Sequence, residues 1–172
     1  MSHISPARRM DAIDWPRVST SLDAQGWATL SKLLTDEECD ATAGLYGGGE
    51  GFRSRVIMAR HGFGRGEYRY FSYPLPSLVQ ALRTGLYPHL APIANGWHER
   101  MGMDVRFPAE HAAFIERCHQ AGQARPTPLL LQYGAGDTTA CTRTYTANTS
   151  FRSRLPSCSP SPASTSRVAS SY

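Results

Sequence analysis

Alternating apolar and polar positions predict several short strands along the chain. The runs 52–58 and 67–73 both alternate, and the glycine-rich residues 60–66 between them are typical of a turn, so these runs predict a β-hairpin. Residues 26–30 predict a further short strand, and the apolar run 128–133 predicts a buried one. No helix follows the glycines of the turn, as a phosphate-binding loop would require, so we interpret them as a turn.

A capping box marks the start of the first predicted helix. The Thr35 hydroxyl is placed to accept from the Glu38 amide, and the Glu38 carboxylate is placed to reach back to the Thr35 amide. We expect the helix to continue to about Tyr46 and to end at the glycines of residues 47–49.

Helical spacing also predicts three helices in the middle of the chain. Residues 76–86 and 90–101 are predicted as two helices, because Pro88 interrupts the pattern. Residues 108–120 predict another, with Pro108 at its first position.

Length and composition favour a single domain. The chain has 172 residues, enough for one modest core. No apolar run approaches the ~20 residues that span a bilayer, and the start has no apolar segment like that of a secretory signal. The four cysteines form no C-x-x-C pair, which argues against a zinc ribbon and a disulfide framework. We therefore expect a cytoplasmic protein with no membrane segment.

Composition divides the chain into a flexible lead-in over residues 1–20, a folded part over 21–137 and a tail over 138–172. The 35 tail residues include seven Thr and nine Ser and no Gly, Asp, Glu, Lys or His, which predicts a disordered tail. Residues 1–137 have 14 basic and 14 acidic side chains, whereas the tail has four arginines and no acid. The basic excess thus lies in the tail, and net charge gives no support for a basic face on the folded part.

The histidines and acidic residues form no complete catalytic site. None of the six histidines occurs in an H-x-D, H-x-H or H-E-x-x-H motif, and no G-x-S-x-G motif is present. Glu116-x-x-His119 has the spacing of half a di-iron carboxylate site, but such a site needs a second copy and further glutamates. We interpret this pair as an exposed helix pair.

The order of predicted elements nevertheless resembles a known enzyme family. Strand, capped helix, hairpin, helices and an apolar strand resemble the first half of the iron(II)/2-oxoglutarate-dependent dioxygenases, in particular bacterial relatives of prolyl hydroxylases and of oxygenases that demethylate damaged nucleic acid. The segments that carry the resemblance are G-W-A-T-L-S-K-L-L-T-D-E-E-C, R-S-R-V-I-M with G-x-G-x-Y-R-Y, and L-L-L-Q-Y-G-A-G-D. The resemblance covers roughly residues 20–137. It implies an α+β fold, a partial double-stranded β-helix (jelly-roll) with N-terminal and flanking helices, so residues 21–137 would be the N-terminal part of a dioxygenase domain.

The same resemblance indicates where iron ligands should lie. In this family the apolar strand leads to an H-x-D motif, and a distal His completes an Fe(II) site that leaves positions open for 2-oxoglutarate and oxygen. Tyr133 matches a family position that often faces the co-substrate, and the expected His and Asp fall at Thr142 and Thr144. Fe(II) and 2-oxoglutarate therefore belong to the intact family, and we expect this chain to bind neither and to be an inactive fragment.

A shifted reading frame offers an explanation of the two threonines. If one base is missing after the Asp137 codon, each threonine codon can mask His or Asp, and the neighbouring cysteine restricts position 142 to Tyr or His. The same shift turns codons for Phe, Leu, Ile and Val into serine codons, so the original frame permits an H-x-D motif and an apolar strand. The alternative is a genuine Ser/Thr-rich linker or interaction tail.

The resemblance leaves the substrate open between a protein residue that is hydroxylated and alkylated nucleic acid that is demethylated. The hairpin arginines, interleaved with Tyr68 and Tyr70, could contact phosphates, since basic and aromatic side chains together bind nucleic acid. The candidate substrate contacts among them are Arg53, Arg55 and Arg69. They are equally compatible with a solvated edge that prevents sheet-to-sheet pairing. A rival function is a non-catalytic binding module with a flexible basic tail.

Overall fold

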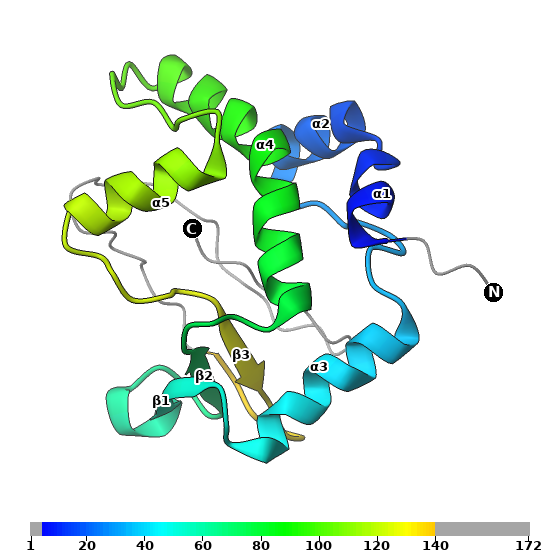
Figure 1. Ribbon diagram of the computed structural model, residues 1–172, viewed down its shortest axis with the longest axis vertical. Coiled ribbons are helices and arrows are strands. Elements are labelled where there is room, and N and C mark those ends of the chain that lie inside the picture. The colour runs from blue at the N-terminus through cyan, green and yellow to red at the C-terminus, as the bar shows by residue number, and fades with distance from the viewer. Residues whose placement is uncertain (1–4, 140–172) are drawn as a thin grey trace. The chain divides into compact units, whose positions relative to one another are not determined.

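The computed structural model describes residues 5–139 and shows two compact units (Figure 1). The helical unit comprises the chain up to Gly51 together with Ser72–Pro126, and the sheet unit comprises Phe52–Phe71 and the chain from Thr127 onward. The mixture of helices with a separate antiparallel sheet confirms the predicted α+β class. A jelly-roll is not confirmed, and most of the predicted tail lies outside the described residues.

Two short helices replace the expected loose lead-in. Helix α1 spans Pro6–Asp11 and α2 spans Trp15–Gln25. The Ser5 side chain accepts from the Arg8 amide and the Asp14 side chain from the Arg17 amide, and each helix has a proline in its first turn. Such N-caps accept hydrogen bonds from backbone amides that have no partner within the helix, which stabilises these helices. The sequence here has no long amphipathic pattern that would predict them.

The predicted strand at residues 26–30 is absent. Gly26 instead ends α2: it adopts the left-handed conformation, with φ of 77°, and its amide donates to the Leu22 carbonyl. Trp27 follows with 59% of its surface exposed, and residues 27–30 belong to no strand of the described sheet. The glycine was a helix stop signal, and the strand prediction was wrong.

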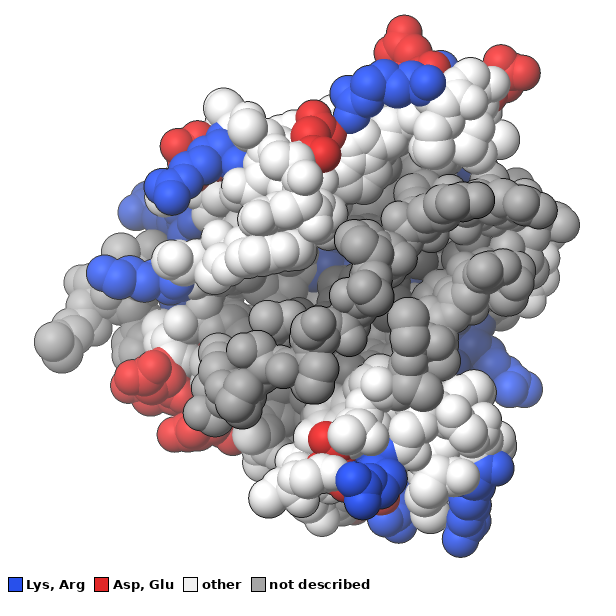
Figure 2. All heavy atoms as spheres, turned by 180° about the vertical axis from the view of Figure 1, so that it is seen from behind, with Lys and Arg blue, Asp and Glu red and all other residues white. Residues whose placement is uncertain are grey.

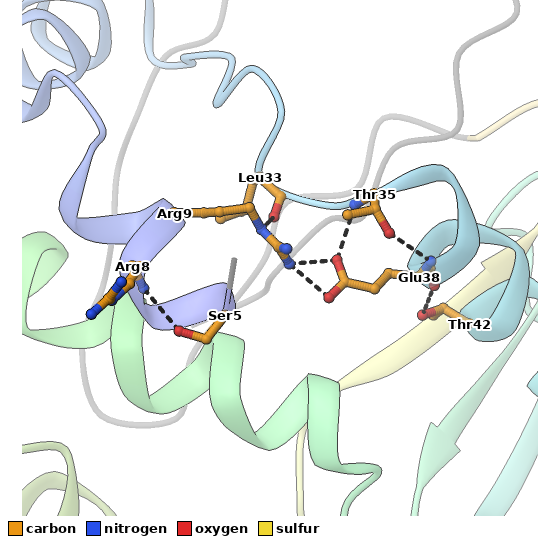
Figure 3. Close-up of polar contacts among 7 residues, drawn as sticks. All are labelled: Ser5, Arg8, Arg9, Leu33, Thr35, Glu38 and Thr42. Atoms are coloured by element: carbon orange, nitrogen blue, oxygen red, sulfur yellow. Dashed lines mark hydrogen bonds and ion pairs between the residues drawn. The ribbon is translucent and has the colours of Figure 1, made fainter. Parts of the chain in front are cut away.

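Helix α3, Asp36–Gly48, confirms the predicted capping box and the glycine end at Gly49. The Glu38 carboxylate also binds Arg9 of α1, whose Nη2 donates to both carboxylate oxygens at 2.6 and 2.5 Å (Figure 3). The Arg9 Nε atom donates to the Leu33 carbonyl at 2.8 Å. One partly buried carboxylate therefore caps α3 and fastens α1 to the start of that helix.

The two helices predicted around Pro88 form one helix, α4, Ser77–Arg100. Pro88 and Pro92 lie inside it, four residues apart, and both are exposed. A proline removes one backbone hydrogen bond and crowds the carbonyl four residues earlier, which bends a helix without ending it when the freed carbonyl faces solvent. Figure 1 shows the ribbon of α4 turning part-way along its length.

Helix α1 packs against α4 at Gly85, a position of α4 that has no side chain. Met10 is 2% exposed, and a Cβ atom built on Gly85 would lie 2.8 Å from the Met10 sulfur. The glycine therefore makes the space that the methionine fills. Val18, Tyr46, Tyr87 and Ala91 supply the other buried apolar side chains of the helical unit.

Helix α5 spans His111–Gln120 and begins later than predicted. The Tyr87 hydroxyl donates to the Pro108 carbonyl at 2.8 Å, and Asn95 both donates to the Phe107 carbonyl and accepts from its amide. These contacts hold residues 107 and 108 against α4 in a non-helical conformation. Buried His98 adds to them, since its Nδ1 lies 2.6 Å from the Val105 carbonyl oxygen.

The sheet unit confirms the predicted hairpin. Strands β1, Phe52–Ile57, and β2, Glu67–Phe71, pair antiparallel, and the 3-10 helix η1, Met58–His61, lies in the connection. Strand β3, Leu129–Gln132, pairs antiparallel with β2, so the order is β1-β2-β3. The predicted strand at 128–133 is confirmed, although its leucines are half-buried and, within residues 5–139, it lies at the edge of the sheet.

Across residues 5–139, no helix combines the length and apolar character that crossing a bilayer requires.

Candidate nucleic-acid interface

The register of the hairpin divides its side chains between two faces. Residues directly opposite in an antiparallel pair share a face, and residues two apart on a strand do so too. We define the arginine face by Arg55, Arg69 and Glu67, and the tyrosine face by Tyr68 and Tyr70. The predicted substrate contacts Arg55 and Arg69 therefore lie together.

On the arginine face, Arg55 and Arg69 are direct cross-strand partners. The guanidinium of Arg55 binds the Glu67 carboxylate, with Nε 2.8 Å from Oε2. Arg69 is half-buried, and its guanidinium carbon lies 5.7 Å from the centre of the Phe52 ring, which stacks on Phe71 at 4.8 Å. A strand irregularity between residues 52 and 54 allows the two phenyl rings to share this face.

On the tyrosine face, the rings of Tyr68 and Tyr70 meet edge-to-face with centres 5.5 Å apart. The guanidinium carbon of Arg53 lies 4.3 Å from the centre of the Tyr70 ring, in cation–π contact. Burial, and then the neighbouring Tyr70, raise the pKa of the Tyr68 hydroxyl, so this group stays protonated and can donate a hydrogen bond. Arg53 therefore lies away from Arg55 and Arg69, with which the sequence grouped it.

Tyr133 lies beside the hairpin connection. A Cβ atom on Gly66 would come within 2.8 Å of the Tyr133 ring, and Gly66 has a φ of 129°, so only glycine fits there. The Tyr133 hydroxyl lies 2.5 Å from the Thr139 hydroxyl oxygen. The backbone of Arg65 exchanges hydrogen bonds with Thr138, which holds the chain after β3 against the connection. The role of Tyr133 toward 2-oxoglutarate stays a prediction.

Charge is segregated between the two units. In the described residues, the sheet unit has five arginines against Glu67 and Asp137, a net charge of +3 with histidine neutral. The helical unit has nine Lys and Arg against twelve Asp and Glu, a net charge of −3. Figure 2, which views the protein from behind so that β1 and β2 of Figure 1 fall at its lower right, shows several Lys and Arg side chains exposed there. Because residues 1–137 have a net charge of zero, the sequence alone did not predict this basic surface.

The described residues do not fit an iron centre. Between residues 5 and 139, no three His, Cys, Asp or Glu side chains lie close enough together to hold a metal ion. The expected ligand positions, Thr142 and Thr144, lie outside the described residues and have hydroxyl groups in place of an imidazole and a carboxylate. A neutral hydroxyl is a poor substitute for the ligands that Fe(II) oxygenases use.

A cleft of about 660 Å³ lies in the helical unit between α4 and α5. Arg83, whose Nη1 donates to the Tyr73 hydroxyl at 3.3 Å, lines it together with His111. Burial, and then the positive charge of Arg83, lower the pKa of His111 below its ordinary value, so the imidazole is kept neutral. Glu116 and His119 also line the cleft, where Glu116 accepts from Gln120, and both are exposed as predicted.

Comparison with known proteins links the chain to a family. Residues 66–154 match the family described as "Oxygenase, catalysing oxidative methylation of damaged DNA". The match covers just over half of the chain, includes β2, α4, α5 and β3, and continues past Asp137 into the tail.

Two curated relatives have no assigned activity. The uncharacterized proteins MT2286 and Rv2227 of Mycobacterium tuberculosis are each 39% identical to the chain over 67 residues, which is 39% of this chain and 29% of theirs. The chain thus aligns with under a third of the length of these relatives. No solved structure matches the chain.

Proposed function

Because the chain belongs to a family of oxygenases described as acting on damaged DNA, we propose that its sheet unit is the part that binds the DNA backbone. The observation that carries this proposal is the net charge of +3 on the described residues of the sheet unit, whereas those of the helical unit sum to −3. Electrostatic attraction to phosphates supplies most of the sequence-independent affinity of DNA-binding proteins. The hairpin adds tyrosine rings beside the arginines, a combination that suits a nucleic acid better than a protein residue.

Both faces of the hairpin offer groups suited to DNA. Arg55 and Arg69 present two guanidinium groups from adjacent strands, and guanidinium groups bind phosphate oxygens in bidentate fashion. On the other face, Tyr70 is covered by Arg53, which offers both a charge and a flat surface. We assign phosphate contacts to the arginine face and base contacts to the tyrosine face.

The double replacement Arg55→Gln/Arg69→Gln is expected to weaken binding of a labelled oligodeoxynucleotide about tenfold. It should also reduce the slope of log K against log salt by about 1.4 to 1.8, because two phosphate contacts are lost. Fluorescence anisotropy across a salt series measures both quantities. The matched control is Arg17→Gln/Arg125→Gln, which removes two exposed arginines of the helical unit. Equal losses in both double variants would contradict the assignment.

The rival function, a binding module that relies on its basic tail, is favoured by the four arginines and absent acids of residues 138–172. The same assay separates the two proposals. Replacing the tail arginines by glutamine should leave most of the affinity if the hairpin binds DNA, and should abolish it if the tail does. The residues to replace are Arg143, Arg152, Arg154 and Arg167.

We further propose that the intact enzyme is an Fe(II)- and 2-oxoglutarate-dependent oxygenase and that this chain does not turn over. The support is that no three metal-binding side chains gather within residues 5–139 and that threonines stand at the expected ligand positions 142 and 144. Supplied with Fe(II), 2-oxoglutarate and oxygen, the purified chain is expected to release no succinate above a protein-free control. Succinate release that depends on both iron and the chain would overturn this. The shifted frame after Asp137 is the proposed cause. An intact frame in clean genomic DNA, with no alternative H-x-D motif, would remove that cause.

A further inference from the structure

We propose that Glu67 is an internal competitor for the DNA backbone: its carboxylate occupies Arg55 in the free protein, and a DNA phosphate takes its place on binding. This inference rests on the proposed function, since it concerns how the arginine face engages DNA. It makes Glu67 a positioning residue that sets how readily the hairpin accepts a phosphate.

The register of the hairpin brings the three groups together. Arg55 and Arg69 are directly opposite across β1 and β2, and like charges in that relation repel each other. Glu67 is two residues from Arg69 on β2 and reaches diagonally across the strands to Arg55. Its charge relieves the repulsion between the two arginines in the free protein. A phosphate on the same face would relieve that repulsion in the same way.

The two side chains of the Arg55–Glu67 ion pair differ in their exposure to solvent. The Arg55 side chain is 54% exposed, whereas the Glu67 side chain is 17% exposed. Arg55 can thus turn toward a ligand in solvent, while Glu67 is confined to the sheet. Both Nε and Nη2 of Arg55 donate to the carboxylate oxygen Oε2 of Glu67. The same two donors suit the oxygens of a phosphate group, which a guanidinium binds in bidentate fashion.

The exchange is weak enough to be reversible. Because the Arg55 side chain is largely in solvent, its pair with Glu67 contributes little to stability, and turning Arg55 toward a phosphate requires little free energy. The displaced carboxylate remains beside the phosphate and repels it. Removing the charge of Glu67 should thus raise the affinity for DNA for two reasons: Arg55 is released, and this repulsion disappears.

Glu67→Gln tests the proposal with the full chain and a labelled oligodeoxythymidine. We expect binding to tighten about two- to fivefold, the range set by an exposed ion pair. The slope of log K against log salt should stay close to that of the wild type, because Arg55 contacts a phosphate in both proteins once DNA is bound. Glu50→Gln, which removes an exposed carboxylate just before β1, should leave the affinity unchanged. Unchanged or weaker binding by Glu67→Gln would overturn the proposal.

A double-mutant cycle distinguishes the exchange from a general charge effect. In an Arg55→Gln background, Glu67→Gln should tighten binding less than it does in the wild type, because only the repulsion between the carboxylate and DNA is then removed. An equal gain in both backgrounds would contradict the exchange. If Glu67→Gln fails to fold, the wild-type protein still gives the answer: its Arg55 Nε–H resonance should shift when oligodeoxythymidine is added, and a stationary resonance would overturn the exchange.

Failure of this proposal is distinct from failure of the proposed function. If the wild-type chain binds DNA and Arg55→Gln/Arg69→Gln weakens it, but Glu67→Gln has no effect, the interface stands and the competitor role falls. If the wild-type chain does not bind the oligonucleotide at all, both fall.

Discussion

Glu38→Ala is expected to lower the free energy of unfolding of the helical unit by about 3 kcal/mol, judged from the loss of a helix cap and of a partly buried ion pair. The Glu38 carboxylate accepts from the Thr35 amide at 2.9 Å and from Arg9 at 2.5 and 2.6 Å. Its removal leaves the start of α3 half-capped and deprives the guanidinium of Arg9, which is only 13% exposed, of its carboxylate. Chemical denaturation followed by circular dichroism measures the change.

Two comparisons separate these contributions. Asp40→Ala removes an exposed carboxylate from the same helix and should cost less than about 0.5 kcal/mol, as surface substitutions do. Arg9→Met/Glu38→Gln removes both charges and should destabilise less than Glu38→Ala alone, because no charge is left without its opposite. A double variant that is less stable than Glu38→Ala would contradict the account of the ion pair.

Met10→Ala is expected to lower the free energy of unfolding of the helical unit by about 3 kcal/mol, since truncation of a buried methionine costs roughly 2 to 5 kcal/mol. Met10 is 2% exposed and fills the space above Gly85. Its loss leaves a cavity between α1 and α4. The same denaturation experiment measures this effect.

The complementary variant is Gly85→Ala. In the wild-type background it should destabilise, because the new methyl group would collide with the Met10 sulfur at 2.8 Å. In the Met10→Ala background it should stabilise, because the space is then open and alanine favours a helix over glycine by about 0.5 to 1 kcal/mol. The same sign in both backgrounds would show that the two residues do not share this space.

Local signals in the sequence predicted the elements whose ends are fixed by their own residues. The Thr35 to Glu38 capping box placed α3, and the glycines of residues 60–66 placed the hairpin, because both features act within a few residues. The interruption at Pro88 was wrong because tolerance of a proline depends on which way the freed carbonyl faces. That direction is set by packing and cannot be read from the helix pattern.

The N-terminal helices were missed for a related reason. Helix α1 has six residues, too few for a clear amphipathic period, and it depends on Met10 entering the gap at Gly85 and on Arg9 reaching Glu38. Helices this short are unstable alone and form through tertiary contacts. Contacts between residues so far apart in the chain cannot be predicted from local patterns in a single sequence.

The sequence singled out Arg53, Arg55 and Arg69 as candidate substrate contacts, and that role stays a prediction. The structure places Arg55 and Arg69 on one face and Arg53 against Tyr70 on the other, because the strand is irregular at the start of β1. Glu67 was not singled out, although a lone acid among five hairpin arginines was a visible signal. The opposite net charges of the two units could not be predicted from the sequence, because each unit combines segments that are far apart in the chain.

Because the described residues of the sheet unit are net positive and those of the helical unit net negative, DNA is expected to meet the sheet unit first during diffusion. The polyanion attracts the sheet unit and repels the helical unit, so encounters that begin at the hairpin are favoured before any specific contact forms. Dissolved ions shorten the reach of this field, and the rate of association should therefore fall with ionic strength more steeply than the rate of release rises.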